Sequence, residues 1–166
     1  MEEFLLKTQS LKQKLYELLK EKNLKISTAE SCTGGMIGAC ITSIPGISSY
    51  YEYGFVTYSN EAKQKLIGVK EETLNRFGAV SAQTVLEMAE GALIVSGSDI
   101  AVSVSGIAGP GGGTCEKPVG LVYIGLASKN KRLFNKFIFN GSRDEVRQQT
   151  VNMAFEMIIN QIDKIN

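Results

Sequence analysis

The order in which helical and strand-like patterns follow one another restricts the fold more than any other feature of this sequence. Four leucines (Leu11, Leu15, Leu18 and Leu19) share one face of an amphipathic helix expected over residues 4–22. An alternating strand pattern follows at residues 24–28, and a turn of small residues then leads into an apolar helix that reaches about residue 41. Further strands are predicted at residues 53–58, 100–104, 121–127 and 132–139, and further helices at residues 60–66, 71–77, from an N-cap at Ser81 to about residue 95, and beyond an N-cap at Ser142.

This order is typical of an α/β fold. Alternating helices and strands place helices on both faces of a mixed sheet. The last two strands are joined by a short polar turn at residues 128–131, which predicts an antiparallel hairpin. A chain of 166 residues, 43% of them hydrophobic, suits one domain, which we expect to span residues 1–166.

The composition excludes several classes of partner. A net charge of +1 gives no broad positive surface for nucleic acid or acidic membranes. No apolar run approaches the roughly 20 residues of a membrane span, and the acidic N-terminus is unlike a signal peptide. The three cysteines lack the spacing of a disulfide framework and are expected to be reduced. We therefore expect a cytoplasmic protein that binds neither nucleic acid nor membranes.

The chain contains no histidine. This removes the commonest general base, the Ser-His-Asp and Cys-His catalytic arrangements, and every histidine-ligated metal site. Acid–base chemistry would have to use lysine, tyrosine, a carboxylate, a thiol or water. We expect no metal and no cofactor.

The small-residue turn at residues 30–35, with the sequence ESCTGG, is the first candidate site. A serine between a strand and a helix, here Ser31, presents its hydroxyl outward, and the amides of Cys32, Thr33, Gly34 and Gly35 are candidates to bind an oxyanion. Cys32 is the alternative nucleophile, and Glu30 is a candidate substrate contact. The simpler interpretation is that Ser31 or Thr33 caps the helix while the glycines close the turn.

A serine nucleophile without histidine needs another base, and a lysine with a lowered pKa is the usual substitute. Lys63 is the candidate because it lies just beyond a strand, at the kind of edge where α/β sheets bind ligands. Tyr58 would relay a proton or hold the lysine amine. The alternative is a solvated helix lysine paired with Glu61 or Glu71.

Residues 105–120 hold six of the 17 glycines, which suggests backbone wrapped around a ligand. The candidate ligand contacts in this segment are Ser105, Gly106, Gly109, Gly111 and Gly112. A flexible surface loop is the alternative.

Arg143 and Arg147 lie four residues apart at the start of the last helix and therefore share a face. Two arginines beside a helix N-terminus suit a phosphate. The alternative is a surface pair that balances Asp144 and Glu145.

Six segments, in order, resemble the C-terminal domain family of the competence/damage-inducible protein CinA, and the similarity runs from about residue 5 to residue 162. They are TAESCTGG (28–35), GFVTYSNEAKQKLIGV (54–69), GAVSAQT (78–84), SVSGIAGPGGG (103–113), EKPVG (116–120) and GSRDEVRQQ (141–149).

The resemblance implies a three-layer α/β/α sandwich, frequently in dimers or larger homo-oligomers. It implies nicotinamide mononucleotide (NMN) deamidase activity, in which the carboxamide is hydrolysed to give nicotinic acid mononucleotide and ammonia. It also implies a nucleophile at Ser31, a base at Lys63 assisted by Tyr58, and substrate contacts at Ser105 and Arg143. Two alternatives stay open: a nucleotide-binding module without chemistry, and an amidase for another small amide.

Overall fold

The structure is a computed structural model that describes the chain trace of residues 2–164 and the side chains of residues 6–164. The strands are β1 (Ile26–Glu30), β2 (Tyr51–Val56), β3 (Ile100–Gly106), β4 (Leu121–Ser128) and β5 (Lys131–Ile138). The helices are α1 (Glu2–Lys22), α2 (Met36–Thr42), α3 (Asn60–Ile67), α4 (Glu71–Phe77), α5 (Ala82–Ser96) and α6 (Arg143–Ile162), with a short 3₁₀ helix η1 (Ile47–Ser49) before β2.

The five strands form one mixed sheet in the order β2-β1-β3-β4-β5. Strand β1 pairs in parallel with both β2 and β3, and β3, β4 and β5 follow one another antiparallel. The predicted hairpin is therefore present as β4–β5, and the expected mixed sheet is confirmed.

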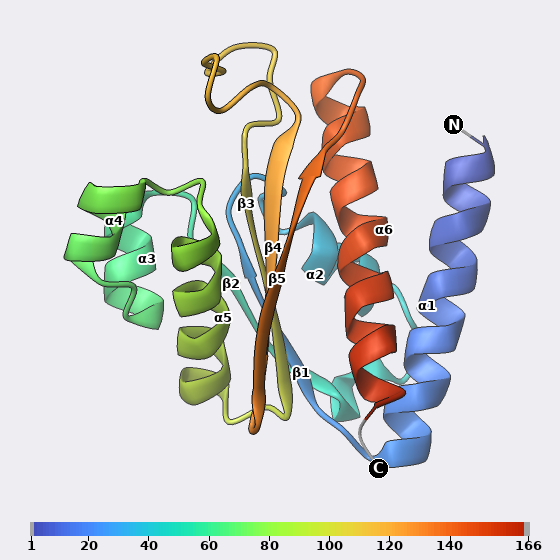
Figure 1. The fold of residues 1–166 in the computed structure, drawn as a ribbon. Helices are drawn as coiled ribbons and strands as arrows, with labels where there is room; N and C mark the ends of the chain where they lie inside the picture. The colour runs from blue at the N-terminus through green and yellow to red at the C-terminus, as the bar shows by residue number, and fades with distance from the viewer. Residues whose placement is uncertain (1, 165–166) are drawn as a thin grey trace.

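Helices cover both faces of this sheet (Figure 1). Helix α5 lies on one face with α3 and α4 packed outside it, while α2 and α6 lie on the other face and α1 packs against α6. The apolar core follows the same division, with a large cluster around Phe155 on the α6 side and a smaller one around Met88 on the α5 side. The three-layer α/β/α sandwich is confirmed.

Helix α3 packs closely on α5 because residue 91 is a glycine. A β-carbon at Gly91 would overlap the carbonyl oxygen of Ile67, at the end of α3. Ser59 begins α3 by accepting a hydrogen bond from the amide of Ala62. This contact between two helices fixes the position of a short helix that carries a lysine of the candidate site.

Several strand ends differ from the prediction, since β1 lies two residues later than expected and β2 begins two residues earlier. Strand β2 ends at Val56, where its last partner on β1 is Glu30, so residues 57–59 form a connection rather than the end of the strand. Strand β3 continues to Gly106 because β4 pairs with it that far. In both cases the neighbouring strand sets the limit.

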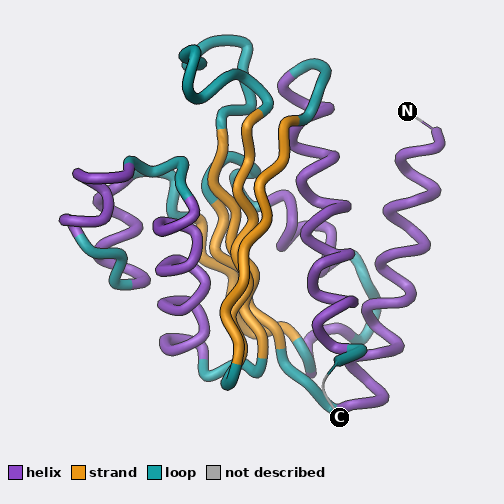
Figure 2. The backbone as a smooth tube through the Cα atoms, viewed as in Figure 1, coloured by secondary structure: helices purple, strands orange, loops and turns teal. Residues whose placement is uncertain are grey.

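The carboxyl ends of β1 and β3, the start of α6 and a long loop over residues 107–120 all lie at the upper end of the molecule (Figures 1 and 2). Residues that the sequence keeps far apart therefore meet at one edge of the sheet. None of the described helices is long and apolar enough to cross a membrane.

Candidate active site

A serine and a lysine meet at the carboxyl end of the central strand. Ser31 directly follows β1, and its amide donates to the carbonyl of Val104 at 3.0 Å, which ties the serine to β3. Lys63, on α3, is 1% exposed, and its Nζ lies 3.2 Å from Ser31 Oγ. The alternative interpretation, a solvated Lys63 paired with Glu61 or Glu71, is wrong. Lys63 is buried, and Glu61 pairs with Lys65 at 2.7 Å.

The environment of Lys63 favours its neutral form. Burial lowers the pKa of Lys63 below its ordinary value of 10.5, and the nearby thiol of Cys32 opposes this only in part. The Nζ donates to the carbonyl of Thr57 at 2.8 Å, and no carboxylate among the described residues pairs with it. A neutral amine within hydrogen-bonding distance of a serine hydroxyl has the geometry that a general base requires.

Burial also decides between the two candidate nucleophiles. Cys32 is 7% exposed, and this burial raises the pKa of its thiol to about 12. The thiol therefore stays protonated near neutral pH, and a protonated thiol is a poor nucleophile. Ser31, which has the lysine beside it, is the better candidate.

Glu30 has a different role from the expected substrate contact. Its carboxylate is 1% exposed and accepts four hydrogen bonds of 2.6–3.0 Å, from the hydroxyl of Thr33 and the amides of Gly35, Ile37 and Gly38. The carboxylate thus satisfies the free amides at the start of α2 and fixes the turn from within. A substrate has no access to it, so the expectation for Glu30 is contradicted.

The same contacts reduce the number of amides that remain for an oxyanion. The amide of Gly35 donates to Glu30, and that of Gly34 donates to the carbonyl of Ser31 at 3.1 Å. Among the described residues, the amides of Cys32 and Thr33 have no such backbone or carboxylate acceptor. Of the four amides predicted to bind an oxyanion, only those of Cys32 and Thr33 therefore remain candidates.

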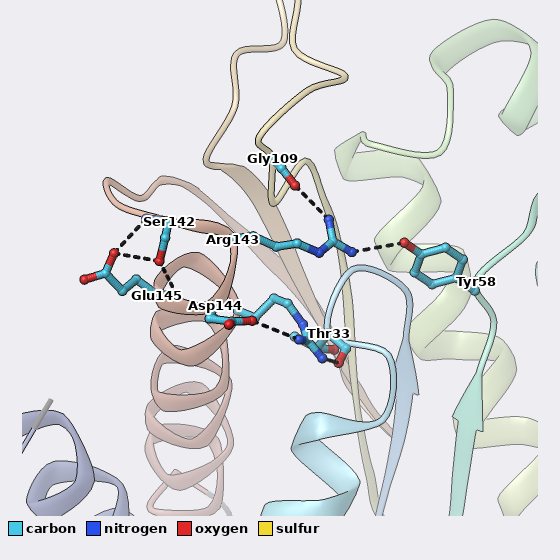
Figure 3. A network of polar contacts seen from close by, with 8 residues as sticks. Thr33, Tyr58, Gly109, Ser142, Arg143, Asp144 and Glu145 are labelled. Carbon is cyan, nitrogen blue, oxygen red and sulfur yellow. Dashed lines mark hydrogen bonds and ion pairs between the residues drawn. The ribbon is translucent and has the colours of Figure 1, made fainter.

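Tyr58 is exposed and contacts an arginine rather than the lysine. Its side chain is 62% exposed, and its hydroxyl accepts a hydrogen bond from Arg143 Nη2 at 3.3 Å (Figure 3). Nη1 of the same arginine donates to the carbonyl of Gly109 at 2.9 Å. The prediction that Tyr58 holds the lysine amine is not what the structure shows, since the carbonyl of Thr57 does so.

Arg147 reaches the serine turn itself. Its Nη2 donates to the carbonyl of Thr33 at 2.9 Å, and its Nη1 lies 3.4 Å from a carboxylate oxygen of Asp144. The Nε of Arg147 is buried without a partner among the described residues. The alternative, in which the two arginines balance Asp144 and Glu145, is therefore right only for Asp144, which pairs with Arg147. Glu145 instead forms a capping box with Ser142.

The glycine-rich segment divides into a structural part and an exposed part. Ser105 is 1% exposed and donates to the carbonyl of Ala79 at 2.7 Å, and a β-carbon at Gly106 would come within 2.7 Å of the carbonyl of Leu121. The Ser105 hydroxyl is therefore already used, which contradicts its expected contact with a ligand, whereas the expected contact at Gly106 stays a prediction. Gly109 turns the backbone at φ 84° toward Arg143, whereas Gly111 and Gly112 lie on the exposed loop.

Thr57 is the residue that sequence reasoning missed. It holds Lys63 through a backbone carbonyl, and such a contact leaves no mark in the side-chain pattern. Because the sequence predicts a strand through residue 58, it does not predict the connection in which Thr57 lies. The earlier end of β2 is what frees this carbonyl for the lysine.

Known proteins share both the sequence and this architecture. The family model of the CinA C-terminal domain matches residues 8–162. The chain belongs to this family. A CinA-like protein of Endomicrobium trichonymphae is 60% identical over 141 residues, which cover 85% of this chain and 33% of that protein. A putative competence-damage inducible protein of Clostridium tetani is 54% identical over 142 residues, or 86% of this chain and 35% of that one.

Two solved CinA-family structures agree with the fold. The competence/damage inducible protein CihA of Agrobacterium tumefaciens is 45% identical, with a TM-score of 0.92 over 95% of this chain and 96% of that one. The competence damage-inducible protein A of Klebsiella pneumoniae is 33% identical, with a TM-score of 0.92 over 96% and 99% of the two chains. This chain spans about a third of the length of the two curated relatives.

Proposed function

We propose that this CinA-family domain is a nicotinamide-nucleotide amidohydrolase that converts NMN and water to nicotinic acid mononucleotide and ammonia. The observation that carries the proposal is the 3.2 Å approach of the buried Lys63 Nζ to Ser31 Oγ. A serine and a neutral lysine form a known pair for acyl transfer. Membership of the CinA family supports the choice of substrate.

In the first half of the reaction, neutral Lys63 takes the proton of the Ser31 hydroxyl while Oγ forms a bond to the carboxamide carbon. The carbonyl oxygen becomes an oxyanion, which the amides of Cys32 and Thr33 stabilise. One such donor is typically worth about 3–4 kcal/mol. Lys63 then gives its proton to the amide nitrogen, the C–N bond breaks, and ammonia leaves a nicotinyl ester on Ser31.

In the second half, Lys63 takes a proton from water, and the resulting hydroxide attacks the ester carbon. The C–O bond to Ser31 breaks, and Oγ recovers a proton from Lys63. The products are the free serine and nicotinic acid mononucleotide. Both halves use the same base and the same oxyanion site.

Arg143 and Arg147 are the candidate contacts for the 5′-phosphate, since their guanidinium groups flank the serine turn and the glycine loop. Binding energy from a remote phosphate orients the reacting amide. We therefore expect free nicotinamide, which has no phosphate, to be a poor substrate.

The test is ammonia release from NMN by the purified protein, with Ser31→Ala and Lys63→Met beside it. Full activity in Ser31→Ala would refute the serine mechanism. A panel with nicotinamide, nicotinamide riboside and unrelated small amides separates an NMN deamidase from an amidase for another substrate. Saturable NMN binding without any ammonia would select the nucleotide-binding module. Activity after treatment with a chelator tests the expected independence from metal.

A further inference from the structure

A cavity lies at the end of the sheet opposite the candidate active site, the lower end of the molecule in Figure 1. It has a volume of about 500 Å³ and is formed by the connections α1–β1 and α5–β3, the β4–β5 turn and the end of α6. This volume is within the roughly 300–1,000 Å³ that small-molecule sites occupy. None of the residues of the candidate active site lines it.

Three lysines gather on this cavity. Lys129 lies in the β4–β5 turn, Lys131 begins β5, and Lys164 follows the end of α6. No ion pair joins any of the three to a carboxylate among the side chains of residues 6–164. Ammonium groups of like charge on one rim repel one another, and a bound anion removes that repulsion.

The wall of the cavity also offers hydrogen-bond acceptors. Gln161 is 6% exposed, and its Oε1 is buried without a partner among the described residues. A buried amide oxygen without a donor is uncommon and unfavourable. Asp99 lies on the same cavity, and although its Oδ2 accepts the amide of Lys25 at 2.7 Å, a carboxylate has further acceptor capacity.

We propose that this cavity binds the ribose phosphate part of a sugar phosphate or nucleotide. The phosphate lies among Lys129, Lys131 and Lys164. Sugar hydroxyls donate to Asp99 and, once the buried Gln161 amide turns toward the cavity, to its Oε1. An anion alone would use only the lysines, and a neutral sugar only the acceptors. A ligand that carries both a phosphate and sugar hydroxyls matches both kinds of lining group. The site is independent of the proposed deamidase reaction, because it shares no residue with it.

The test is an NMR titration of the ¹⁵N-labelled 166-residue protein with ribose 5-phosphate, adenosine monophosphate (AMP) and inorganic phosphate. We expect saturable shifts at the amides of residues 128–131 and 161–164. In Lys129→Ala/Lys131→Ala, the affinity for ribose 5-phosphate should fall at least about tenfold. The matched control Lys65→Ala/Lys70→Ala removes the same charge from the α3–α4 region and should bind normally.

Two further arms make the outcome decisive. Gln161→Leu should weaken ribose 5-phosphate while leaving inorganic phosphate unchanged, and a thermal melt will show whether this variant folds. Shifts confined to residues 31–35 and 143–147, or no saturation at 10 mM ligand, would overturn the proposal. Equal affinity for inorganic phosphate and ribose 5-phosphate would overturn the assignment of Asp99 and Gln161 to the sugar. Comparison of AMP with ribose 5-phosphate distinguishes a nucleotide from a sugar phosphate.

Discussion

The serine turn and the glycine loop border the same site but are held in different ways. Ser31 is 9% exposed and Lys63 is 1% exposed, and both are fixed by backbone partners on β3 and on residue 57. On the glycine loop, residues 110–116 are exposed, and its bridge to Tyr58 runs through a single arginine. The two residues proposed to react are thus held in place before a substrate binds, whereas the groups expected to meet the substrate can adjust to it.

The largest effect on NMN turnover should come from changes in the buried pair, Ser31 and Lys63. Ser31→Ala and Lys63→Met should each slow the turnover of NMN at least about 10⁴-fold, because both remove a group that takes part in bond making. The double variant should be no slower than either single variant, since the two residues act as a unit. Ammonia release in single-turnover and steady-state assays measures this. Multiplicative losses in the double variant would show that the two residues act separately.

The pH dependence of activity and of stability should both report the lowered pKa of the buried Lys63. Because burial lowers the pKa of Lys63, kcat/KM should rise about tenfold per pH unit below that pKa and level off above it, at a pH below 10.5. The unfolded lysine binds a proton that the folded one releases, so the free energy of unfolding should also rise between the lowered pKa and 10.5.

Lys63→Met is the control for this stability effect, since it removes the titrating group. Urea unfolding of the two proteins across this pH range measures the difference. Identical pH slopes in the wild type and the variant would contradict a lowered pKa for Lys63.

A smaller effect is expected from the internal carboxylate. Glu30→Gln replaces one acceptor oxygen by a donor that faces the amides of α2, and should lower the free energy of unfolding by about 2–3 kcal/mol. The exposed Glu61→Gln is the matched control and should change it by less than about 0.5 kcal/mol. Equal stability of the two variants in urea would show that the four contacts of Glu30 contribute little.

The smallest effect should come from changes in the exposed contact between Tyr58 and Arg143. Tyr58→Phe removes only the acceptor for Arg143, so KM for NMN should rise about two- to fivefold while turnover stays nearly unchanged. Arg143→Lys is a useful companion, because it keeps the charge but loses the two-pronged contact. If Tyr58→Phe instead slowed turnover by about two orders of magnitude or more, Tyr58 would have a role in proton transfer. The buried serine turn would then not be the only region with reacting groups.

The pattern of the sequence predicted the sheet and its helices well because these depend on local periodicity. The ends of β2 and β3 were missed because neighbouring strands set them. The absence of histidine, the positions of Ser31 and Lys63 just beyond strands, and the family resemblance together predicted that these two residues form a pair. The structure places them 3.2 Å apart, and their catalytic roles stay a proposal. By contrast, Glu30 and Ser105 look like ligand contacts in the sequence, and only the packing around them shows that their polar atoms are already used.

Gly91 influences the candidate site without contacting Ser31 or Lys63. It permits α3 to rest directly on α5, so the Lys63-to-Ser31 separation is set by helix-to-helix contact as well as by local bonds. A methyl group at position 91 would displace α3 outward and carry the amine with it. The distance between the proposed base and the proposed nucleophile therefore depends partly on a residue that contacts neither of them. If the proposed reaction occurs, a change at position 91 should slow it without altering a group that takes part in it.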